Sequence, residues 1–91
     1  MTDTEMLEKV KAGLGLSGEY MNPTISVKVI AVKGYMVNAG VTVEQVETDL
    51  GIACLTVGVN DLWNLGSGEV KFSPAFDIIM CQLKAVSMPD A

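Results

Sequence analysis

The stretch NPTISVKVIAVKGYMVNAG, residues 22–40, decides the fold class of this chain. Its first half alternates apolar and polar side chains, which is the pattern of a β-strand with one buried face. Ile25, Val29 and Val32 nevertheless recur at the spacing of one helix face, and the apolar run is long for a strand. Because β-branched residues lower helix propensity only mildly, we predict a helix over residues 23–38.

Local signals support the ends of that helix. Asn22 followed by Pro23 is typical of an N-cap with proline at the first helical position, and Gly40 closes the stretch. Gly34 falls inside the predicted helix, where it is either a weak point or a site of close packing.

Similar signals predict helices on both sides of this stretch. Thr2 with Glu5 has the spacing of a capping box, as has Thr42 with Gln45. Ser73 precedes a proline and repeats the cap-plus-proline start. The further helices are expected over residues 3–12, 43–49, 52–64 and 74–86. The predicted fold is therefore all-α, a small bundle of four to five short helices.

Four further glycines indicate where the predicted helices end, break or pack closely. Gly13 and Gly15 are expected to end the first helix, since glycine adopts the left-handed conformation of a helix exit. Gly51 is expected to mark a break or a bend before the helix of residues 52–64. Gly58 lies inside that helix, where it is either tolerated at about 1 kcal/mol relative to alanine or marks a close helix crossing.

The chain of 91 residues has the size of one domain, with an ordered core over residues 3–86 and a short tail over residues 87–91. Hydrophobic residues make up 49% of it and charged residues 19%, which is too apolar for a disordered segment. The longest apolar stretches, residues 25–32 and 52–59, are too short to span a bilayer, so we expect no membrane span.

The charged residues exclude several classes of function. All six basic residues are lysines, and the chain contains no arginine and no histidine. The missing arginine argues against a nucleic-acid reader, and the missing histidine removes Ser-His-Asp and Cys-His catalysis and His-ligated zinc. Residues 1–40 are balanced, whereas residues 41–91 carry seven acidic residues against two lysines and so account for the whole net charge of −5. These acids form either a solvated surface or a face that repels polyanions or meets a basic partner.

Two cysteines, Cys54 and Cys81, stand in apolar surroundings, and we predict two buried free thiols in a reducing cytoplasm, with a structural disulfide as the alternative. They form no CxxC pair, so no metal is expected. The G-x-G-x-x-G pattern of residues 13–18 follows a predicted helix where the nucleotide-binding motif needs a strand. We expect no cofactor and no enzymatic activity.

Contact with a partner is a better hypothesis for several residues near predicted loops. Tyr20 and Met21 lie in the loop before residue 22, whereas helix methionines such as Met36 more often fill a core. Asp61, close to Trp63, has no second carboxylate nearby for general acid–base work, so it is expected to be a surface or capping acid. The candidate interaction residues are Tyr20, Met21, Asn60, Asp61, Trp63, Phe72 and Met88.

Five short sequence segments follow one another in an order that is similar to that of a known protein family. They are MLEKVK (residues 6–11), LGL (14–16), YMVNAGV (35–41), VGVNDLW (57–63) and KFSPAF (71–76). Over residues 5–84 this order resembles the head–tail connector (head-completion adaptor) family of tailed bacteriophages and prophages. The phrases around Asn60 and Phe72 match best.

The resemblance implies a small helical virion protein without enzymatic activity. Such subunits form a homo-oligomeric, dodecamer-like ring beneath the portal protein, although many are monomeric before docking. The ring extends the channel through which DNA passes without specific binding, and it docks a tail-side connector or stopper protein. The implied location is the head–tail interface of the virion, and the bacterial host cytoplasm during assembly. The alternative is a generic acidic helical interaction module, such as a regulatory subunit.

Overall fold

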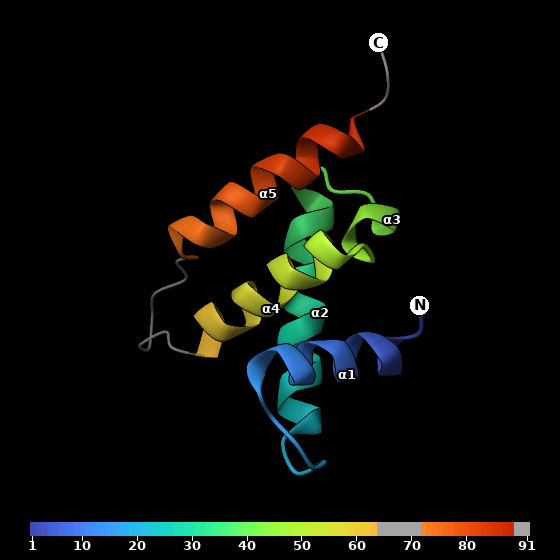
Figure 1. The fold of residues 1–91 in the computed structure, drawn as a ribbon, viewed down its shortest axis with the longest axis vertical. Coiled ribbons are helices and arrows are strands. Elements are labelled where there is room, and N and C mark those ends of the chain that lie inside the picture. Colours follow the sequence, from blue (N-terminus) through green and yellow to red (C-terminus); the bar gives the residue numbers. More distant parts are fainter. Residues whose placement is uncertain (64–71, 89–91) are drawn as a thin grey trace.

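A computed structural model describes residues 1–63 and 72–88, and within them the chain forms five α-helices and no strand (Figure 1). The helices are α1 (Asp3–Leu14), α2 (Asn22–Asn38), α3 (Val43–Val46), α4 (Asp49–Trp63) and α5 (Pro74–Ser87). This confirms the all-α prediction, including a helix where residues 25–29 alternate like a strand. No helix in the described part is long and apolar enough to cross a bilayer.

The predicted ends of α1 are largely confirmed. The Glu5 amide donates to Thr2 Oγ1 at 3.1 Å and the Thr2 amide donates to Glu5 Oε1 at 3.2 Å, which completes the capping box. These bonds hold the pKa of the Glu5 carboxyl below its ordinary value. Gly15 ends the helix with a left-handed φ of 73°. Gly13, which we expected to help end the helix, instead lies inside it.

Two predicted caps differ from the structure. The helix α2 begins at Asn22, so Met21 is the N-cap and no side chain caps this end. A turn in which the Asn22 amide donates to Glu19 O brings the helix start forward by one residue. Thr42 accepts from the Gln45 amide as predicted, but its own amide donates to Ser87 Oγ at 3.1 Å, because the end of α5 lies beside the start of α3.

The predicted break at Gly51 is wrong, because α4 begins at Asp49 and runs through this glycine. The Gly51 amide donates to Thr48 Oγ1 at 3.1 Å, which starts the helix earlier than the apolar pattern indicates. A side chain at Gly51 would collide with the Gln45 and Val46 carbonyl groups, so the glycine allows α4 to pass close to α3. The helix α3 accordingly ends at Val46, before the predicted residue 49.

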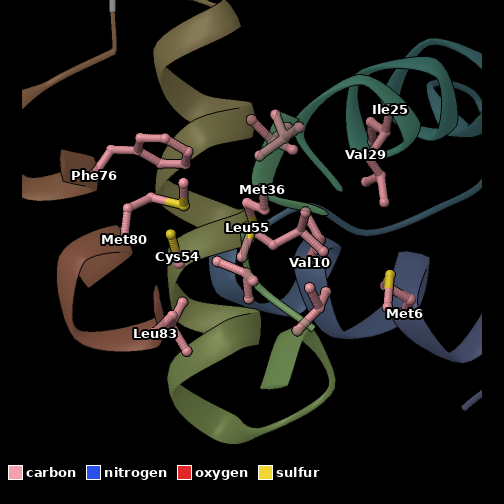
Figure 2. Close-up of a cluster of buried hydrophobic side chains, with 14 residues drawn as sticks. Met6, Val10, Ile25, Val29, Met36, Cys54, Leu55, Phe76, Met80 and Leu83 are labelled. Atoms are coloured by element: carbon pink, nitrogen blue, oxygen red, sulfur yellow. The ribbon is translucent and has the colours of Figure 1, made fainter. Parts of the chain in front are cut away.

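The helix α4 forms the centre of the fold, and it contacts each of the other four helices (Figure 1). Side chains from α1, α2, α4 and α5 meet in one buried cluster (Figure 2). Its largest fully buried members include Phe76, Ile25, Met36 and Leu55, each contributing about 1.5–3 kcal/mol by burial. At Gly58 an added Cβ would lie 2.6 Å from Val32 Cγ1 and 2.8 Å from Phe76 Cε2, so this glycine marks a close helix crossing.

Candidate functional site

An open groove lies between the C-terminal ends of α1 and α4. Leu14 and Leu16 line it from one side and Asn60 and Trp63 from the other, around a volume of about 180 Å³. The predicted candidates Asn60 and Trp63 therefore share one site, together with two leucines that the sequence did not single out. The exposed edges of Leu16 and Trp63 suit this groove to an apolar side chain of a partner.

The indole ring of Trp63 is held from α2. Lys28 Nζ lies 5.4 Å from the centroid of the Trp63 ring, within the range of a cation–π contact. The contact orients the ring at the mouth of the groove and keeps part of its surface exposed. Residues 28 and 63 are far apart in sequence, so periodicity could not have indicated this pair.

Asp61 joins α4 to α5. Its Oδ2 accepts from the Ser73 amide at 2.9 Å and from Ser73 Oγ at 2.8 Å, while Ser73 Oγ accepts from the Phe76 amide at 3.3 Å. The carboxylate therefore holds the hydroxyl that caps the start of α5. This is the capping role expected for Asp61, and it directs Oδ2 inward, toward α5.

Phe72 belongs to an aromatic cluster at the same joint. Its ring stacks on Phe76 with centroids 4.1 Å apart, and Tyr35 of α2 lies 4.8 Å from Phe72. Phe72 is half-buried and packs against the core. Its position indicates a role in fixing α5 against α2 and α4.

The other three candidates do not join these groups. Tyr20 is 93% exposed in the loop between α1 and α2, and Met88 is exposed at the C-cap of α5. This loop and the C-terminal end of α5 lie toward opposite ends of the long axis (Figure 1), which extends 46 Å. Met21 is half-buried and packs against the core. The seven candidates therefore fall into separate regions.

Lys11 is a residue whose role the sequence analysis missed. Its charge and its place near Glu8 and Lys9 indicate the solvent side of the helix, but it is only 5% exposed. Its Nζ donates to Gly18 O at 2.6 Å and lies 3.6 Å from Glu8 Oε1. The loop folds back over α1 and covers the lysine, so Lys11 anchors the loop that carries Tyr20. Periodicity cannot detect a lysine whose ammonium group bonds a backbone carbonyl.

The two cysteines differ from each other. Cys54 is a buried free thiol as predicted, and burial, followed by the charge of Asp77, raises its pKa to about 12. Cys81 is also a free thiol but is exposed, so the prediction that both are buried is wrong. Cys81 falls on the side of α5 opposite the core residues Phe76 and Met80, where apolar neighbours in sequence do not bury it.

An apolar helix face lies outside the predicted candidates. Val27 and Ile30 are each 67% exposed, although the opposite side of α2 is buried in the core. We define the outer α2 face by its exposed residues Val27, Ile30, Ala31, Gly34 and Val37. This face went unnoticed in the sequence because apolar residues occur all around the helix and give no contrast between its two sides.

A second exposed surface combines apolar and acidic side chains where α3 meets α4. We define the acidic corner by Val43, Glu44, Glu47, Asp49 and Leu50. The two apolar members are exposed, and Glu47 pairs with the N-terminal ammonium group at 3.3 Å. This corner therefore has the apolar and charged character of an interface rim.

In residues 1–63 and 72–88, no three Cys, Asp or Glu side chains are grouped so that they could hold a metal ion. In comparisons with known proteins, no family model, curated protein or solved structure matches this chain.

Proposed function

We propose that this chain is a structural subunit of a phage head–tail connector, which acts by self-assembly and by docking to a portal protein and a tail-side protein. The observation that carries the proposal is the helix α2, which has apolar side chains on both sides although only one side is buried within the domain. An apolar side of a helix is typically packed against another element. A neighbouring subunit would supply the missing cover.

The order of helices and phrases supports the same proposal. The phrases that resemble the connector family fall on α1, α2, α4 and the start of α5. Two of them meet in the structure, since Asp61 caps the helix that begins after Phe72. The net charge of −5, all of which arises after position 40, suits a ring through which the phosphate backbone of DNA passes without binding.

A second function is favoured by the groove between α1 and α4. Leu16 and Trp63 form an apolar surface at the opening of this groove. Such a surface suits a regulatory module that binds an apolar side chain from one helix or loop of a protein partner. In that case the groove, and not α2, would carry the activity.

Matched substitutions separate the two functions. We expect Ile30→Asp on the outer α2 face to abolish ring formation by the full chain, measured by light scattering with the portal protein of the same phage present. Leu16→Asp in the groove is the control and is expected to leave ring formation intact. The connector proposal is wrong if Leu16→Asp disrupts assembly while Ile30→Asp has no effect, or if neither the wild-type chain nor its mixture with portal forms a ring.

A further inference from the structure

We propose that the outer α2 face of one copy docks on the acidic corner of the next copy. This inference rests on the proposed self-assembly and names the two surfaces that would carry it. Three features of the chain support this contact: a glycine without a packing role, the spacing of the exposed apolar residues and the distribution of charge.

Gly34 has no packing role among the residues that the structure describes. At Gly13, Gly51 and Gly58 an added Cβ would collide with a neighbouring element, and Gly15, Gly18 and Gly40 adopt a positive φ. Gly34 is helical, and a Cβ built there meets nothing within 4 Å. Glycine inside a helix costs about 1 kcal/mol relative to alanine, so it is disfavoured here unless something outside the domain approaches closely.

Four residues of the outer α2 face form one continuous row that includes this glycine, and we call this row the seam. Val27, Ile30, Gly34 and Val37 follow one another at steps of three and four, which is the spacing of a helix face that packs on another element. Gly34 leaves a shallow point in the middle of the seam where a neighbouring backbone or side chain fits. The seam itself carries no charged residue.

The charges near the seam indicate which surface of a second copy can pack against it. Residues 20–43 contain Lys28 and Lys33 and no acid, whereas residues 34–70 contain five acids and no basic residue. Pairing α2 with α2 of another copy would bring lysines together, which like-charge repulsion disfavours. The acidic corner offers the opposite charge beside exposed apolar side chains.

The two surfaces also meet the requirement of a closed ring. A ring of identical subunits uses a heterologous interface, in which one surface of a subunit contacts a different surface of the next. The outer α2 face and the acidic corner are different surfaces. The first is apolar and lies on a helix whose only charged residues are Lys28 and Lys33, whereas the second carries three acids. Each copy can therefore contact two neighbours at once.

Cysteine cross-linking tests the contact directly. In a full-length Cys81→Ser background, Ile30→Cys on α2 and Val43→Cys at the acidic corner are combined in one chain and oxidised at assembling concentration. We expect a ladder of disulfide-linked multimers. Val43→Cys combined with Ile78→Cys on α5 is the matched control and is expected to give no ladder. A missing ladder, or efficient dimers from Ile30→Cys alone, would overturn the proposal.

Charge reversal gives an independent test. Lys33→Glu or Glu44→Lys alone is expected to weaken self-association at least tenfold in sedimentation velocity, and the double variant is expected to recover it. Unchanged association in both single variants would overturn the proposal. Portal-bound rings without the cross-link would refute this interface but not the connector function. The cross-link without any binding to portal would refute the connector function but not the interface.

Discussion

The contrast between two helical glycines gives the sharpest test of the packing described above. Gly34→Ala should stabilise the monomer, because the added methyl group meets no atom within 4 Å and the helix gains about 1 kcal/mol of propensity. Gly58→Ala brings the same gain in propensity but places its Cβ 2.6 Å from Val32 Cγ1 and 2.8 Å from Phe76 Cε2.

The neighbours of Gly58 cannot move aside easily. Val32 and Phe76 are both fully buried, and the Phe76 ring is stacked on Phe72. Overpacking of this kind costs about 1–3 kcal/mol, so Gly58→Ala should be neutral to destabilising by about 2 kcal/mol after the propensity gain is subtracted. In a domain of this size 1 kcal/mol corresponds to about 4–8 °C in Tm.

Urea denaturation followed by circular dichroism, at a concentration where the chain is monomeric, measures both effects. We expect the two alanine variants to shift the midpoint in opposite directions or, at the least, Gly34→Ala to be the more stable by 1 kcal/mol or more. A Gly34→Ala variant less stable than Gly58→Ala would refute the packing argument for both positions.

Other predictions concern individual contacts. Asp61→Ala removes the acceptor of two hydrogen bonds at the start of α5 and should destabilise the fold by about 1–2 kcal/mol in urea denaturation. Cys81 should react with iodoacetamide at pH 8 while Cys54, whose pKa is raised to about 12, stays unmodified in the folded chain, as measured by mass spectrometry. Lys11→Met should release the loop of residues 15–21 and speed its hydrogen exchange.

Each of these has a control. Glu19→Ala, in the exposed loop, should leave stability unchanged, and Asp61→Ala with an equally small effect would contradict the capping role. Both thiols should react in urea, whereas equal rates in the folded chain would contradict the burial of Cys54. Lys9→Met on the exposed side of α1 should not alter exchange in the loop, and Lys11→Met matching it would contradict the anchor.

Features that depend on neighbours in sequence were predictable. The capping box at Thr2 and the serine cap before Pro74 each act within a few residues, and both occur as predicted. The helix α4 begins before its predicted start because the Thr48 hydroxyl accepts from the Gly51 amide. Gly51 itself serves a close approach to α3, which only the tertiary structure shows. The same glycine signal therefore indicates a break in an isolated segment and a packing site in the folded domain.

The candidate site was predictable only in part, because some of its contacts also depend on the tertiary structure. The Asp61 cap and the exposure of Tyr20 agree with the expectations from sequence, but Leu16 joins the groove through the fold of the α1–α2 loop. The alternation that makes residues 25–29 look like a strand comes from a helix with apolar residues on both sides. The ambiguity in the sequence and the exposed face of α2 thus have one physical origin.

The number of copies bound to the portal protein tests the central claim most directly. Native mass spectrometry of the full chain mixed with the portal protein of its phage should show a closed set of copies matching the symmetry of the portal ring. Binding of a single copy, or no binding under conditions where the chain is folded, would contradict the connector proposal.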